Sequence, residues 1–293
     1  MGILLGLAGA VCWGVADFIA RFASRRVGAY RTLLFMQVFG FLGLSAYLQW
    51  THGFGKISAH GWQPWAFGAI AGIVNMVASL ALYYSFQIGV MSVVAPVSSS
   101  YPALTVALAL LSGEHLQALR GVGLAVTLIG VVLASTSFAA DTAQGPADGS
   151  HAHARLTKGV VWAIVAAAGF GVLFWFLGFH VVPVLGSVIS VWIIRLTSFT
   201  VLVLAAAPTR QSIALPRGSV WWLLMGVGLL DTAAFVFNNA GLQSVQVSVV
   251  SVLASLYGAV TVVLSWVFLR ERLERSQWLG IALIFAGIVL VSY

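Results

Sequence analysis

Apolar residues run along this chain in long blocks with few polar breaks. Residues 57–113 contain no Asp, Glu, Lys or Arg, and the same holds for several other stretches. A membrane-spanning helix needs about 20 apolar residues, so residues 57–113 hold two spans, and Gln87-Ile88-Gly89 is the natural break between them. The pattern predicts ten transmembrane helices, at residues 2–23, 31–49, 63–86, 91–111, 116–137, 159–179, 185–207, 218–240, 247–269 and 274–292.

The composition agrees with a protein built for lipid. Hydrophobic residues make up 61% of the 293 positions and charged residues 7%, whereas about a quarter of a soluble domain is charged. So few charges cannot build a water-facing surface, which excludes soluble, disordered and disulfide-rich secreted proteins. The net charge is +7, but the basic residues are scattered in short loops, which argues against nucleic acid as a partner. The expected partner is the lipid bilayer.

The two halves of the chain resemble each other. Residues 100–106 align with residues 256–262 at an offset of 156, and other helices align at 156 or 157. The matched pairs include Asn75 with Asp231, Gln87 with Gln243, Gly123 with Gly280, Gly130 with Gly287, and Trp13-Gly14-Val15 with Phe170-Gly171-Val172. The predicted domains are a five-helix repeat at 1–137, a polar linker at 138–158 and a second five-helix repeat at 159–293. The glycines at seven-residue spacing predict close helix packing.

Because each repeat has an odd number of helices, the two repeats enter the membrane in opposite senses. The predicted fold class is therefore all-α integral membrane, with ten transmembrane helices as two inverted five-helix repeats. Inverted repeats are a transporter architecture, in which the substrate binds near the midplane between the halves.

Several local features occur together in both halves. Trp13-Gly14 lies in the first helix, the last helix of each half is rich in glycine, and the paired endings are LSGEHL at 111–116 and LRERL at 269–273. In these features the sequence resembles the EamA type of the drug/metabolite transporter superfamily, and within it the amino-acid and metabolite exporters. The resemblance implies a secondary carrier whose cavity is lined mainly by the first, third, fourth, sixth, eighth and ninth helices.

Charged side chains inside a span are costly in lipid and therefore informative. Arg195 and Asp231 fall at the same depth of the consecutive seventh and eighth helices, so we expect them to pair. Their repeat mates Gln37 and Asn75 would then form an amide pair in the other half. A structural clamp and a site for a substrate carboxylate or for proton coupling both fit the ion pair.

Asp17 is a further acid in an apolar stretch, four residues before Arg21. An ion pair at this spacing, reaching water at the helix end, is the simplest interpretation. Proton coupling is the alternative, and protons would then be a second partner of a carrier. The candidates for a buried polar pair or for coupling are Asp17, Arg195, Asp231 and Gln37.

Polar and aromatic side chains near mid-depth are the candidates for the wall of a substrate cavity. They are Trp13, Asn75, Ser79, Tyr83, Ser98, Ser99, Tyr101, Phe170, Trp175, Asn238, Ser251, Ser255 and Tyr257. In the fourth helix, Pro96 and Pro102 each free a backbone carbonyl, which in a membrane must face protein or a wet cavity. The serines could instead bond back to their own helix, and the aromatic residues could pack against the core or lipid.

Together these features favour a secondary transporter that exports small polar metabolites, above all amino acids, by alternating access through a central cavity. We expect the cavity to be nearly neutral, because Arg195 offsets Asp231, and a neutral cavity suits a zwitterion. The alternatives are a sugar or cationic-drug carrier of the same fold and, in another class, a channel or an integral-membrane enzyme. The sequence contains no nucleophile elbow, zinc-protease motif or P-loop. We therefore predict no catalytic residue, cofactor or metal, and interpret His151 and His153 as part of a solvated linker.

Loop charges and the family resemblance predict opposite orientations in the membrane. Eleven Lys and Arg follow odd-numbered helices, whereas Lys56 and Arg120 follow even-numbered ones. The positive-inside rule then puts both termini outside the cell, and the resemblance implies that they are cytoplasmic. Labelling of cysteines introduced into the 138–158 linker in intact cells distinguishes the two. In either case we expect a protein of the bacterial inner membrane that functions as a monomer.

Overall fold

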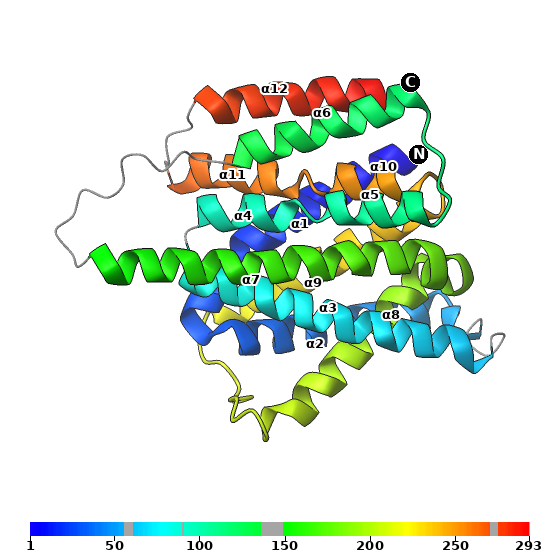
Figure 1. The fold of residues 1–293 in the computed structure, drawn as a ribbon. Coiled ribbons are helices and arrows are strands. Elements are labelled where there is room, and N and C mark those ends of the chain that lie inside the picture. The colour runs from blue at the N-terminus through cyan, green and yellow to red at the C-terminus, as the bar shows by residue number, and fades with distance from the viewer. Residues whose placement is uncertain (56–60, 90, 136–148, 270–274, 293) are drawn as a thin grey trace.

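The computed structural model describes residues 1–55, 61–89, 91–135, 149–269 and 275–292. The first half comprises α1 (Gly2–Val27), α2 (Ala29–Trp50), α3 (Trp62–Ile88), α4 (Met91–Ser99), α5 (Pro102–Leu111) and α6 (Ala118–Ser135). The second half comprises α7 (Gly149–Phe176), the π-helical turn η2 (Leu177–Val181), α8 (Val182–Ala206), α9 (Val220–Leu242), α10 (Val247–Ala254), α11 (Tyr257–Leu269) and α12 (Arg275–Ser292). The start of α1 and the end of α12 lie at the same end of the bundle (Figure 1), as an even number of crossings requires.

In the described part of the chain, six helical stretches are long and apolar enough to cross a membrane. One of them, Gly159–Ala206, has 48 residues and contains both α7 and α8, and another, Val247–Phe268, joins α10 and α11. Three shorter apolar helices complete the ten predicted crossings, at Val97–Leu111, Ala118–Gly130 and Trp278–Leu290. Many large apolar side chains are exposed on the outside of the bundle, where lipid would cover them.

The helices predicted at 91–111 and 247–269 are each broken near the middle. Pro102 begins α5, where its missing N–H costs no helical hydrogen bond. The break between α10 and α11 has no proline. The two breaks bring Tyr101 and Tyr257, which the repeat aligns with each other, to the start of the second piece of each broken helix.

The chain changes direction between α7 and α8 (Figure 1). Gly186 has a φ of 74° inside α8, a left-handed value that glycine adopts without the steric cost of a side chain. This agrees with the boundary predicted between the sixth and seventh helices.

The helix predicted at 159–179 begins earlier in the structure than expected. Residues 149–158 form the first turns of α7. The sequence there is rich in good helix formers, and adding turns to an existing helix is easier than starting one. Residues 138–148 and the side chains of His151 and His153 lie outside the described residues.

The two repeats interlock, because the first helix of each half packs against the broken helix of the other. Thr261 Oγ1 donates a hydrogen bond to the carbonyl oxygen of Gly14 (3.2 Å), and Thr105 Oγ1 donates one to that of Gly171 (3.0 Å). A side chain at either glycine would clash with the partner helix. The same contact therefore occurs twice, at positions that the repeat aligns.

The last helices of the two halves, α6 and α12, lie side by side (Figure 1). A Cβ atom at Gly130 would lie 2.8 Å from the carbonyl oxygen of Gly280, and one at Gly287 would lie 2.8 Å from that of Gly123. Both distances are too short for a real contact. The prediction that these glycines serve close helix packing is confirmed.

Candidate functional site

A cavity lies between the two repeats. Its described lining residues are Trp13, Asp17, Ser79, Leu82, Tyr83, Tyr101, Phe170, Phe174, Asp231, Phe235 and Tyr257. They come from α1, α3 and the start of α5 in the first half, and from α7, α9 and α11 in the second. These elements belong to the first, third, fourth, sixth, eighth and ninth crossings, the same set that the resemblance implied.

Aromatic rings form most of the cavity wall, with Phe174 at the centre of the group. Its ring centroid lies 5.0 Å from that of Tyr101, 5.5 Å from Trp13, 5.7 Å from Phe235 and 6.1 Å from Phe170. Contacts at these distances stabilise the wall beyond simple area burial. The rings come from both repeats, so the wall depends on the two halves being packed together.

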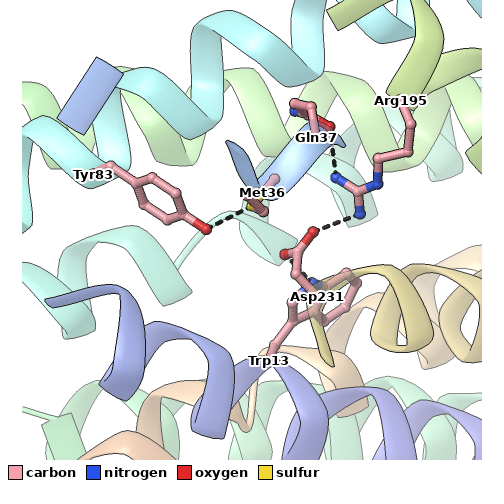
Figure 2. Close-up of polar contacts among 6 residues, drawn as sticks. All are labelled: Trp13, Met36, Gln37, Tyr83, Arg195 and Asp231. Carbon is pink, nitrogen blue, oxygen red and sulfur yellow. Dashed lines mark hydrogen bonds and ion pairs between the residues drawn. The ribbon is translucent and has the colours of Figure 1, made fainter. Parts of the chain in front are cut away.

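A buried polar network stands next to the cavity, and Figure 2 shows how its members meet. Arg195 Nη2 lies 2.5 Å from Asp231 Oδ2, and Arg195 Nη1 donates to Gln37 Oε1 (3.0 Å). The indole Nε1 of Trp13 donates to the other carboxylate oxygen of Asp231 (3.0 Å). The predicted pairing of Arg195 with Asp231 is confirmed.

The amide pair predicted between Gln37 and Asn75 is wrong. Gln37 accepts its hydrogen bond from Arg195, which is long enough to reach from α8 to α2. Within the described residues, neither the amide nitrogen nor the amide oxygen of the Asn75 side chain has a hydrogen-bond partner, although the residue is fully buried. The Gln37 amide of the first repeat is therefore hydrogen-bonded to the ion pair of the second repeat.

Arg195 does not face the cavity. The side chain is 0% exposed, and its guanidinium carbon lies 4.9 Å from the centroid of the Phe235 ring. Phe235 itself lines the cavity, as does Asp231. The aromatic ring and the carboxylate together therefore hold the guanidinium within the protein, which fits the structural-clamp interpretation of this residue.

Asp17 lies in the cavity wall and is 5% exposed to solvent. The expected ion pair between Asp17 and Arg21 is not among the contacts of the described residues. Asp17 is one turn from Trp13, so both side chains leave the same face of α1, toward the cavity rather than the helix end. Within the described part of the chain, the Asp17 carboxylate has neither a hydrogen-bond donor nor a cationic partner. The expectation of a nearly neutral cavity did not include this group.

The hydroxyl groups of the three lining tyrosines are bonded to the protein. Tyr83 donates to Met36 Sδ (2.8 Å), which Figure 2 also shows. Tyr101 donates to the carbonyl oxygen of Ser251 (3.1 Å), and Tyr257 donates to Ser98 Oγ (3.2 Å). The tyrosines therefore present mainly ring surface to the cavity.

The serines predicted for the cavity in the broken helices lie outside its described lining. Ser98 Oγ donates to the carbonyl oxygen of Ala95 (3.0 Å), and Ser255 Oγ donates to that of Val252 (2.7 Å). These are bonds to the preceding turn of the same chain segment, as the alternative interpretation proposed. The predicted residues that lie outside the described lining are Asn75, Ser98, Ser99, Trp175, Asn238, Ser251 and Ser255.

Two of these residues have other partners. Trp175 Nε1 donates to Ser112 Oγ (2.8 Å), just past the end of α5. Asn238 is fully buried and its amide nitrogen donates to Asn239 Oδ1 (3.4 Å), while Asn239 donates to Ser190 on α8 (3.0 Å). Asn239 thus joins α9 to α8, and neither asparagine is among the described lining residues of the cavity.

Sequence reasoning missed three lining residues, Leu82, Phe174 and Phe235. Phe174 follows Phe170 by one helical turn, and Phe235 follows Asp231 by one turn. Residues four apart lie on the same face of a helix. Extending each predicted lining residue by one turn would have identified both phenylalanines.

Comparison with known proteins places the chain in a family. A model of the EamA-like transporter family matches residues 1–136 and 157–293. The chain belongs to the EamA-like transporter family. An uncharacterized transporter of Archaeoglobus fulgidus is 24% identical over 275 residues, which are 92% of this chain and 79% of that protein. An uncharacterized protein of Methanocaldococcus jannaschii is 31% identical over 136 residues, 46% of this chain and 96% of that protein, about the length of one repeat.

A protein of known crystal structure has the same fold. It superposes with a TM-score of 0.72 at 17% sequence identity, and the match covers 99% of this chain and 96% of that chain. This EamA protein is therefore an integral membrane transporter of ten helices in two inverted repeats, and it is not an enzyme.

One of the family-like endings has a structural role that the sequence did not suggest. Glu114 accepts hydrogen bonds from the backbone N–H groups of Val247 and Ser248, both at 3.1 Å, at the start of α10. Nearby, Arg120 Nη1 donates to Gln246 Oε1 (2.9 Å). A carboxylate from the α5–α6 connection thus caps a helix of the other repeat. Its repeat mate Glu271 lies outside the described residues.

We expect Glu114→Ala to lower the free energy of unfolding of this EamA protein by about 0.5–2 kcal/mol, the usual cost of losing a helix N-cap. Glu114→Gln should cost less, because one amide oxygen can still accept. The matched control is Gln117→Ala, at an exposed position of the same connection. Unfolding by SDS in mixed micelles measures the three variants, and equal stability of Glu114→Ala and Gln117→Ala would contradict the capping role.

Proposed function

We propose that this EamA protein is a secondary carrier that moves a small organic solute across the membrane by alternating access of the cavity between its repeats. The observation that carries the proposal is the position of the cavity, whose described lining residues come from both repeats. Movement of one repeat against the other would open such a site to each side of the membrane in turn. The inner membrane of a bacterium is the expected location.

The solute that fits this cavity has a positively charged nitrogen and an apolar body. Seven of the eleven described lining residues are aromatic, and Asp17 and Asp231 supply the two carboxylates. Amino acids, predicted from the sequence, and organic cations, the alternative, share a charged nitrogen, whereas sugars lack one. Phosphorylated solutes are disfavoured, because they need unpaired basic groups and the Arg195 guanidinium is already bonded to Asp231 and Gln37.

The coupling of this carrier would depend on Asp17. A buried ionised carboxylate is costly without a counter-charge, so the empty carrier would hold a proton there and the loaded carrier would hold the solute nitrogen. Export driven by inward proton movement follows from this competition. Uptake into proteoliposomes with and without a pH gradient tests the coupling separately from transport itself.

We expect a tryptophan that fills the cavity to abolish transport. Ser79 lines the cavity on α3, whereas Val77 on the same helix is 50% exposed on the outside. Ser79→Trp should lower the uptake of labelled solutes by at least about tenfold, since the bulky ring occupies the binding space. Val77→Trp is the matched control and should keep the wild-type rate. The panel contains amino acids, sugars and organic cations, and equal rates for the two variants would refute transport through this cavity.

A further inference from the structure

The charges around the cavity do not balance. Asp231 is paired with Arg195, and the guanidinium is held behind Phe235, out of contact with the cavity. Asp17 faces the same cavity, and within the described residues it has no partner. When both carboxylates are ionised, the described groups in and behind the cavity wall therefore carry one negative charge that a solute could offset.

The cavity also has few free hydrogen-bond donors. The indole of Trp13 donates to Asp231, and Tyr83, Tyr101 and Tyr257 donate to protein acceptors. Among the described lining residues, this leaves the Ser79 hydroxyl as the side-chain donor without a described hydrogen bond. A carboxylate is bound by charged or multiple donors. A solute carboxylate that entered the cavity would be a second anion beside Asp17, and only the Ser79 hydroxyl among the described lining residues could donate a hydrogen bond to it.

Aromatic faces suit the opposite charge. A cation within about 6 Å of a ring centroid is attracted by the negative face of the ring, and desolvation strengthens this attraction. The rings of Trp13, Tyr101 and Phe170 each contact the ring of Phe174, and all four residues line the cavity that Asp17 faces. An ammonium group could therefore lie against the carboxylate while its substituents contact the rings.

The repeat makes the asymmetry of the site visible. At the offset of 157, Asp17 aligns with Phe174, and at 156 Ser79 aligns with Phe235. The first repeat thus contributes the unpaired acid and the hydroxyl, and the second repeat contributes phenylalanines at the matching positions. An acid and a hydroxyl of the first repeat thus correspond to phenylalanine rings of the second, and one ammonium group with an apolar body can contact both kinds of residue.

We propose that the cavity selects organic cations that lack a carboxylate, with Asp17 as their counter-ion, and that it discriminates against amino acids. The proposal rests on the proposed carrier function and narrows its substrate class. Amines, guanidines and quaternary ammonium compounds fit it. Zwitterionic amino acids do not, because their carboxylate meets Asp17 and finds no free basic group among the described lining residues.

A matched pair of solutes tests the proposal. Trimethyl-phenethylammonium and N,N,N-trimethylphenylalanine share the ring and the permanently charged nitrogen, and they differ in the carboxylate. Neither crosses lipid readily, so uptake into proteoliposomes reports the protein. We expect the cation to bind and to enter at least about tenfold better than its carboxylated counterpart, because the extra carboxylate places a like charge next to Asp17, which strongly disfavours binding.

Variants of Asp17 complete the test. Asp17→Asn should lower binding and uptake of the cation by at least about tenfold, and Asp17→Glu should restore much of it. Each variant is first checked for a monodisperse elution profile in detergent. Because the preference between the two solutes is measured on the unmodified protein, the proposal can fail even if the variants do not fold.

The outcomes separate this proposal from the carrier function on which it rests. Equal or faster entry of the carboxylated solute, or of phenylalanine, would overturn the cation proposal and leave the carrier standing. Unchanged cation uptake by a folded Asp17→Asn variant would overturn the role of Asp17. If no solute of the panel enters, in either direction of a pH gradient, both proposals fail together.

Discussion

Replacement of Arg195 with methionine is expected to lower the free energy of unfolding by about 3–5 kcal/mol, because the change leaves a buried carboxylate without its partner. Asp231 would keep the hydrogen bond from Trp13 and lose the cation 2.5 Å from its other oxygen. Gln37 would lose its donor as well. Few single substitutions cost this much stability, and a buried charge left without its partner is one of the known causes of such a loss.

A double variant separates the contribution of the two charges from the contribution of side-chain packing. Arg195→Gln combined with Asp231→Asn removes both charges and leaves amides of similar reach, so no ion is left alone. We expect the double variant to regain most of the stability lost by Arg195→Gln alone or by Asp231→Asn alone, since the partners of a charge pair are strongly non-additive. Unfolding by SDS in mixed micelles gives the three values. Additive losses would show that the two residues act independently and would contradict the clamp.

The ion pair was predictable because depth in a membrane can be counted along the chain. Consecutive helices run in opposite directions at a fixed rise per residue, so the depths of Arg195 and Asp231 follow from their positions within the two helices. The repeat aligned Tyr101 with Tyr257, and the structure shows in addition that the two side chains contact each other. Their rings are nearly parallel, at an angle of 12° with centroids 6.4 Å apart.

The rotation of each helix about its own axis was not predictable in the same way. Whether Asp17 turns toward Arg21 or toward the cavity depends on which helices pack around α1, and those lie far away in the sequence. Gln37 similarly bonded to Arg195 because α2 packs beside α8. The serines of the broken helix were ambiguous for a local reason, since a hydroxyl can satisfy itself within its own turn.

The glycine contact between α6 and α12 should be the most sensitive packing site away from the cavity. A Cβ atom at Gly130 would lie 2.7 Å from the backbone nitrogen of Ile284 and 2.8 Å from the carbonyl oxygen of Gly280. Backbone atoms cannot move aside as a flexible side chain can, so Gly130→Leu must separate the two helices. We expect a loss of about 1–3 kcal/mol or more, the range found when a well-packed interior is overfilled.

A second glycine on α6 supplies the matched control for this last prediction. Gly121 has no atom of the protein within 4 Å of the position where its Cβ would lie. Alanine is favoured over glycine in a helix by about 1 kcal/mol, so Gly121→Ala should be neutral or stabilising, whereas Gly130→Ala should destabilise in spite of the same gain. The difference between the two alanine variants isolates the steric term, because helix and substitution are the same. Equal stability of the two would mean that α6 and α12 are not held at this distance, and the packing role of the repeated glycines would then be wrong.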